Sequence, residues 1–202
     1  MSDATTQPSS VTNHRRLAFQ SPVLVTGATG FIGTHVVREL LERGYRVRAG
    51  MRSVGDDKTA HLTRLAGSAE RLELVRIDVL EPLSLKAAVQ GCEGVVHVAA
   101  SVRFAAANPQ RDIVDVAEQG TRHILEAAFE AGSVRRFVLT SSVAAVMSYG
   151  EGSERTFCES DWAEGNTVRS NPYAVAKTLS ERFAWDFVRE HSGRRAITGR
   201  SH

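Results

Sequence analysis

Three glycines, spaced three residues apart, separate a short apolar segment from a segment with helical periodicity near the start of the chain. Residues 23–25 are apolar and rich in β-branched side chains, which predicts a buried strand. After the glycines, apolar residues recur at the spacing of one helix face: Ile32, Val36, Val37, Leu40 and Leu41. Gly27, Gly30 and Gly33 therefore occupy the turn of a strand–turn–helix unit, which strongly favours an α/β fold.

Each glycine of this turn would have its own task in a site that binds a dinucleotide. One permits a tight turn, one lets backbone amides approach a pyrophosphate, and one allows close packing of helix and strand. The helix N-terminus then faces the phosphates with free N–H groups and a positive dipole end. The spacing G-x-x-G-x-x-G differs from the commoner G-x-G-x-x-G, but its context favours dinucleotide binding over a structural turn. The expected cofactor contacts in the turn are Gly27, Thr29, Gly30, Phe31, Ile32 and Gly33.

The alternation of strands and helices continues along the chain. Further strands are predicted at residues 45–51, 72–77, 95–99 and 136–140, with a candidate sixth strand at 195–198. Helices are predicted at residues 58–66, from residue 82, at 111–131 and at 171–190. Short connections in this order predict an α/β fold of the Rossmann type, a doubly wound parallel sheet with helices on both faces.

Composition narrows the class of protein further. The 202 residues fit one globular domain, and 42% apolar with 24% charged residues allow a buried core. No apolar run approaches the roughly 20 residues of a membrane span, and a net charge of +2 does not favour nucleic acid as a partner. Two cysteines make no disulfide framework, and no Cys/His cluster has the spacing of a metal site. Residues 1–20 lack the apolar core of a secretory signal, so we expect a disordered leader, an NAD(P)-binding domain at 21–202 and a cytoplasmic location.

The end of the second predicted strand indicates which dinucleotide binds. An NAD-binding site places Asp or Glu there, about 20 residues after the glycines, to accept from the ribose 2′-hydroxyl. This chain has Arg52 at that position. A guanidinium pairs with a 2′-phosphate, which a carboxylate would repel, whereas a solvated strand-end arginine is the alternative reading. Arg52 therefore favours NADP(H) over NAD(H).

A serine, a tyrosine and a lysine complete the pattern. Tyr173 and Lys177 are four residues apart, so they lie on one face of the last predicted helix. An apolar stripe at Val175, Leu179, Phe183 and Phe187 is expected to pack on the sheet, and Trp185 to lie in the core. Ser142 follows the fifth strand, so all three polar side chains can meet in the crevice at the carboxyl ends of the strands. His97 lies in an apolar strand and is expected to be a hydrogen-bonded core histidine rather than a catalytic one.

These segments resemble the extended short-chain dehydrogenases/reductases of the epimerase/dehydratase superfamily, and within them the dihydroflavonol reductase and cinnamoyl-CoA reductase branch. The likeness covers about residues 22 to 190, in the family's order: residues 23–33 (VLVTGATGFIG), 47–52 (VRAGMR), 91–99 (GCEGVVHVA), 136–142 (RFVLTSS) and 173–185 (YAVAKTLSERFAW).

The resemblance implies roles for particular residues. Ser142, Tyr173 and Lys177 would be the catalytic triad, and Arg52 would read NADPH. Tyr173 and Lys177 would also contact the cofactor, Asp78 and Val79 the adenine, and Val98, Ala99 and Ala100 the ribose side. Many extended members carry an asparagine where this chain has Ala117, so the role of that asparagine does not carry over.

Three functions follow from the sequence as alternatives. The first is an NADPH-dependent reductase of a ketone or aldehyde, in which Tyr173 donates a proton and Ser142 a hydrogen bond to the carbonyl oxygen. The second is an epimerase or dehydratase that keeps NAD bound and acts on nucleotide sugars, and the third is a dinucleotide-binding protein without catalysis. Extended members place much of the substrate pocket after the catalytic helix, so we expect this chain to be truncated, to bind NADPH weakly, to turn over little and to self-associate.

Overall fold

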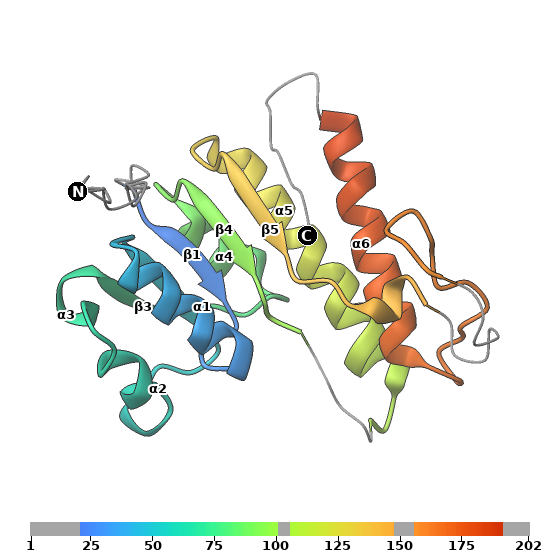
Figure 1. The fold of residues 1–202 in the computed structure, drawn as a ribbon, viewed down its shortest axis with the longest axis horizontal. Coiled ribbons are helices and arrows are strands. Elements are labelled where there is room, and N and C mark those ends of the chain that lie inside the picture. The colour runs from blue at the N-terminus through green and yellow to red at the C-terminus, as the bar shows by residue number, and fades with distance from the viewer. Residues whose placement is uncertain (1–20, 101–105, 148–155, 192–202) are drawn as a thin grey trace, which may run out of the picture.

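Five parallel strands form one sheet in the part of the chain that the computed structural model describes, residues 21–100, 106–147 and 156–191 (Figure 1). The strands are β1 (Val23–Thr26), β2 (Val47–Met51), β3 (Leu72–Arg76), β4 (Gly94–His97) and β5 (Arg136–Leu139). Their spatial order is β3-β2-β1-β4-β5, which confirms the predicted doubly wound α/β fold. The candidate sixth strand and the predicted leader lie outside the described residues.

Helices cover both faces of the sheet (Figure 1). One face carries α1 (Phe31–Glu42) and α2 (Asp56–Thr63), and a short helix α3 (Ser68–Arg71) leads into β3. The other face carries α4 (Pro82–Val89), α5 (Val116–Ala131) and α6 (Pro172–His191). A π-helical turn η1 (Gln110–Asp115) precedes α5, and a 3-10 turn η2 (Val143–Ala145) follows β5.

The two cores follow from the alternation of side chains along the central strand β1. Leu24 packs with α4 and α5, whereas the next residue, Val25, packs with α1 and α2, and both are fully buried. The apolar residues of β1 are buried from both sides, as a strand between two helical layers must be. This packing fixes β1 in the middle of the sheet, with the glycine turn at its carboxyl end.

The structure corrects the predicted packing of α6. The buried residues at the start of this helix are small: Ala174, Ala176, Thr178 and Ser180. Leu179 is 38% exposed and Trp185 is 42% exposed, so the predictions that Leu179 packs on the sheet and that Trp185 lies in the core are wrong. Small side chains form the buried face at the start of α6, whereas Leu179 and Trp185 lie on its exposed side. Phe187, farther along the predicted stripe, is buried as expected.

None of the helices within the described residues has the length and apolar character needed to cross a lipid bilayer. In the same ranges, no three His, Cys, Asp or Glu side chains gather into a group that could hold a metal ion.

Candidate functional site

The turn after β1 has no room for larger side chains at two of its glycines. Gly27 has a φ of +66°, and a Cβ atom there would lie 2.9 Å from the backbone N and Cα of Ala99. A Cβ atom on Gly33 would lie 2.1 Å from the carbonyl oxygen of Gly27. Both positions therefore require glycine, one for the turn beside β4 and one for the contact between helix and turn. This geometry fits two of the three tasks predicted for the glycines, the tight turn and the close packing of helix and strand.

The first turn of α1 is open to solvent. Gly30 is the N-cap residue, and no side chain caps the helix. Phe31 is 83% exposed and Ile32 is 52% exposed, although both are large and apolar, and Thr29 is exposed as well. An uncapped helix N-terminus beside tightly packed glycines offers the backbone donors and the positive dipole end that a pyrophosphate needs. Of the predicted cofactor contacts in the turn, Thr29, Gly30, Phe31 and Ile32 are exposed, whereas Gly27 is half-buried and Gly33 is buried.

Arg52 lies beside this turn. It directly follows β2, whose Gly50 pairs with Thr26 of β1 and accepts a hydrogen bond from the N–H of Ala28 at 3.2 Å. The Arg52 side chain is exposed, and it has no ion pair or hydrogen bond with any described residue. A guanidinium that no described residue pairs with at this end of β2 suits an anionic group such as a 2′-phosphate.

Asp78 and Val79 are built into the turn that leads from β3 to α4. The carboxylate of Asp78 accepts from the N–H of Leu80 at 2.9 Å, and the N–H of Asp78 donates to Ser84 Oγ at 3.0 Å. The side chain of Val79 lies 3.0 Å from where a Cβ atom on Gly120 of α5 would stand. The contacts of Asp78 and Val79 with an adenine stay predictions.

A buried hydrogen-bond network joins the ends of β1 and β4. The Oγ1 of Thr26 accepts from the N–H groups of Val98 at 3.2 Å and Ala99 at 3.1 Å, so its own proton is directed to Nδ1 of His97 at 2.8 Å. Burial, with the charge of Lys177 as a smaller cause, lowers the pKa of His97 to about 4. His97 is thus a neutral, hydrogen-bonded core histidine, as the sequence predicts.

A pocket opens where the carboxyl ends of β4 and β5 meet α5 and α6. Its lining combines backbone and side chains from all four elements: His97, Ala99, Ala100, Ala117, Thr121, Leu139, Thr140, Ser141, Tyr173, Ala176, Lys177 and Ser180. Tyr173 and Lys177 therefore share one cavity with two of the three residues predicted on the ribose side, whereas Val98 does not line it. This brings the predicted catalytic pair to the crevice at the strand ends.

Lys177 is anchored in this pocket. Its Nζ donates a hydrogen bond to the carbonyl oxygen of Thr140 at 2.7 Å and lies 5.9 Å from the centre of the Tyr173 ring. Burial lowers the pKa of Lys177, and the nearby carboxylate of Glu181 opposes that effect.

Ser142 and its neighbour Ser141 have different surroundings. The Oγ of Ser142 accepts from the N–H of Ala144 at 3.1 Å and caps η2, and Ser142 is not among the described residues that line the pocket. Ser141 does line the pocket, and its hydroxyl donates to the carboxylate of Glu181. The catalytic role of Ser142 stays a prediction.

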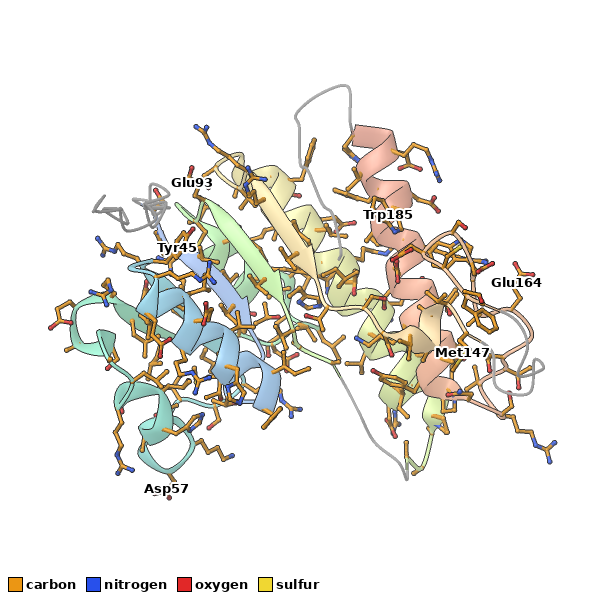
Figure 2. The ribbon with its side chains drawn as sticks, in the orientation of Figure 1. Tyr45, Asp57, Glu93, Met147, Glu164 and Trp185 are labelled. Carbon is orange, nitrogen blue, oxygen red and sulfur yellow. The ribbon has the colours of Figure 1, made fainter. Side chains whose placement is uncertain are left out.

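The segment before α6 lies against that helix. The side chain of Arg182 lies 4.9 Å from the ring centre of Trp162 and 3.4 Å from the carboxylate of Glu164. Figure 2 shows Glu164 and Met147 beside the lower half of α6, far from Tyr45 at the opposite ends of the strands. These contacts hold the segment against α6, and none of its described residues lines the pocket.

Several site residues escaped sequence reasoning. Thr26 binds the predicted core histidine His97, Glu181 raises the pKa of the predicted Lys177, and Ser141 donates a hydrogen bond to Glu181. One signal for Thr26 is a polar residue that ends an otherwise apolar strand, and one for Glu181 is its position one helical turn after Lys177. Ser141 carried no signal of its own, because its contact joins residues 40 positions apart.

Comparison with known proteins agrees with the fold and the motifs. A sequence model described as the NAD dependent epimerase/dehydratase family matches residues 23–202. The chain is 46% identical over 165 residues to cinnamoyl-CoA reductase 1 of Oryza sativa subsp. japonica, covering 80% of this chain and 47% of that protein. It is 40% identical over 174 residues to dihydroflavonol 4-reductase of Arabidopsis thaliana, covering 83% of this chain and 45% of that protein.

Solved structures show the same likeness. The structure of yeast methylglyoxal/isovaleraldehyde reductase complexed with NADPH matches with a TM-score of 0.78 and 29% identity, covering 87% of this chain and 55% of that chain. Vestitone reductase from alfalfa (Medicago sativa) matches with a TM-score of 0.68 and 31% identity, covering 86% of this chain and 54% of that chain. The chain therefore spans about half the length of the curated relatives and solved structures that it matches.

Proposed function

Because the chain belongs to the NAD dependent epimerase/dehydratase family, we propose that it acts as an NADPH-dependent reductase that converts a ketone or aldehyde into an alcohol. The names of its relatives support this proposal, since cinnamoyl-CoA reductase, dihydroflavonol reductase and a methylglyoxal/isovaleraldehyde reductase all describe reductions of carbonyl compounds. The observation that carries it is the pocket in which Tyr173 and Lys177 meet the ends of β4 and β5, beside the glycine turn.

The chain's own residues fit the cofactor. The turn at Gly27–Gly33 and the uncapped start of α1 would hold the pyrophosphate, and the exposed guanidinium of Arg52 would pair with the 2′-phosphate. When bound, the cofactor supplies a hydride to the carbonyl carbon. The protein must then orient the substrate and provide a proton to its oxygen.

Tyr173 is the proton donor in this proposal. The ammonium of Lys177 stabilises the phenolate that remains after the proton has left, and its hydrogen bond to Thr140 fixes its position. Ser142 accepts from the N–H of Ala144, which leaves its own hydroxyl proton free to be donated to the carbonyl oxygen. Such a donor stabilises the negative charge that develops on that oxygen.

The two alternative functions have less support. An enzyme that retains NAD is expected to carry a carboxylate at the end of β2, where this chain has Arg52. A binder without catalysis has no need of a tyrosine and an anchored lysine in one pocket. The small-molecule carbonyl partner belongs to the reductase proposal, whereas self-association and a cytoplasmic location stay predictions.

The reductase proposal is tested by following the absorbance of NADPH with a panel of aldehydes and ketones. Tyr173→Phe removes the proton donor but keeps the ring, so we expect turnover to fall at least ~10²-fold, with little change in NADPH affinity. Tyr45→Phe is the matched control, because Tyr45 precedes β2 at the amino ends of the strands, opposite the ends that form the pocket (Figure 2). Equal turnover by the parent and Tyr173→Phe would refute the assignment of the donor.

A further inference from the structure

Glu181 lies on α6 one helical turn after Lys177 and two turns after Tyr173. Its side chain is partly buried, and both carboxylate oxygens have partners. Oε2 accepts from the hydroxyl of Ser141, and Oε1 accepts from Nε1 of Trp185 at 3.3 Å. The carboxylate is therefore held in place rather than solvated as an ordinary surface glutamate would be.

The contact with Ser141 joins two parts of the site that are far apart in sequence. Ser141 lies between Thr140, whose carbonyl holds Lys177, and Ser142, which caps η2. Glu181 lies on the helix that carries Tyr173 and Lys177. The hydrogen bond between Ser141 and Glu181 thus connects the strand end that carries the predicted carbonyl-binding serine to the helix that carries the predicted proton donor.

The charge of Glu181 also acts on Lys177. Burial favours the neutral amine, and the Glu181 carboxylate is the group that opposes this by raising the pKa of Lys177. The other titratable groups of the pocket lining are Tyr173 and His97, the latter neutral at ordinary pH.

Several charged groups on the neighbouring elements have partners other than Glu181 and Lys177. On α5, Arg122 lies 4.1 Å from the ring centre of Phe183 and 3.7 Å from Glu118. On η1, Asp112 pairs with Arg111, and in the segment before α6, Glu164 pairs with Arg182. The turn η2 has no titratable side chain.

We propose that Glu181 is a positioning residue for the reduction: its carboxylate ties the Ser141–Ser142 strand end to α6 and places a negative charge one helical turn from Lys177. The hydrogen bond from Ser141 to Glu181 keeps the hydroxyl groups of Ser142 and Tyr173 in a fixed position relative to each other. This matters because misplacement of a catalytic group by about 1 Å can cost up to ~10²-fold in rate. The negative charge of Glu181 keeps the buried amine of Lys177 protonated, as the proposed chemistry of Tyr173 requires. The inference rests on the proposed function for its catalytic meaning.

The titration of Lys177 can be measured without any turnover. The chain has three lysines, Lys58, Lys86 and Lys177, so ¹³C-lysine labelling gives three ε-carbon signals that can be followed against pH. We expect Glu181→Gln, which keeps the shape of the side chain but removes its charge, to move the Lys177 midpoint to lower pH. The midpoints of Lys58 and Lys86 are expected to stay where they are.

The control is Glu130→Gln, because Glu130 forms an ion pair with Lys86 at 2.7 Å and neither residue is among the described residues that line the pocket. It can move the Lys86 signal and is expected to leave Lys177 unchanged. Glu181→Asp keeps the charge, so its Lys177 midpoint should stay closer to the parental value than that of Glu181→Gln. It also serves as the charged comparison if Glu181→Gln folds poorly. A Lys177 midpoint that is the same in the parent and in Glu181→Gln overturns the proposal.

Ser141→Ala tests the hydrogen bond between Ser141 and Glu181 separately from the charge of Glu181. It removes the hydroxyl that binds Glu181 but leaves the carboxylate, so the Lys177 midpoint should change little, while NADPH-dependent turnover falls ~10-fold. Unchanged turnover in Ser141→Ala would contradict the tie. If the parent reduces no carbonyl compound while the Lys177 midpoint still responds to Glu181→Gln, the proposed function fails and the charge effect of Glu181 stands.

Discussion

His97 makes the stability of the fold depend on pH in a way that can be worked out from the structure. Its imidazole is buried, accepts the hydroxyl proton of Thr26 on Nδ1, and has its pKa lowered from 6.5 to about 4. In the unfolded chain, His97 therefore binds a proton near pH 6.5, whereas in the folded chain it binds that proton only near pH 4. Because the unfolded state binds more protons in this window, stability falls as the pH drops from about 6.5 to about 4. At pH 5 the loss from His97 amounts to about 2 kcal/mol.

The test compares the parent with His97→Asn, in which an amide oxygen can still accept from Thr26 but cannot titrate. Urea unfolding of both proteins at about pH 7.5 and at about pH 5 gives the free energy of unfolding for each. We expect the parent to lose about 2 kcal/mol more than His97→Asn between the two pH values. All other histidines and carboxylates are shared by the two proteins, so their contributions cancel. Equal losses in the two proteins would refute the assignment of a neutral buried histidine.

Three further predictions concern the cofactor and the surface. Arg52→Asp should reverse the preference between NADPH and NADH in a fluorescence titration, and equal affinity of the parent for both would show that Arg52 does not read the 2′-phosphate. Gly33→Ala should cost ~1–3 kcal/mol of stability and weaken NADPH binding, because its Cβ would meet the Gly27 carbonyl. In chemical unfolding, Gly55→Ala should cost less, because its Cβ meets nothing within 4 Å and the change weakens only the N-cap of α2. Val138 and Trp185 are 46% and 42% exposed, so the chain should self-associate in sedimentation, and a monomer at high concentration would contradict this.

The fold was predictable because its signals are local. Short apolar strands and helices with a 3.6-residue period follow one another, and the glycine turn marks the first crossover, so the order of elements and the class of sheet followed directly. The packing of α6 was not predictable in the same way. A stripe at Leu179 and Phe187 indicates an apolar face, but the small residues Ala174 and Ala176 decide which face approaches the core. That choice depends on the shape of α5 and of the strand ends, which the spacing of residues on α6 does not contain.

The residues of the site also fall into two groups, those that local sequence predicts and those that meet only through contacts between distant segments. Tyr173 and Lys177 share a helix face by their spacing alone, and Gly27 and Gly33 are required by the turn that contains them. The supporting contacts are between distant segments: Thr26 with His97 across two strands, and Ser141 with Glu181 across 40 residues. Residue types in these pairs are common throughout proteins, so only the folded arrangement reveals that they meet.

The most direct test of the reductase proposal is to follow the transferred hydrogen itself. Incubation with NADPH that carries deuterium at both positions of the nicotinamide C4, together with an aldehyde or ketone, should place one deuterium on the carbinol carbon of the product, seen by mass spectrometry. Tyr173→Phe should yield at least ~10²-fold less of this labelled alcohol in the same time. A product without deuterium, or no alcohol from any carbonyl compound of the panel under saturating NADPH, would contradict the proposal.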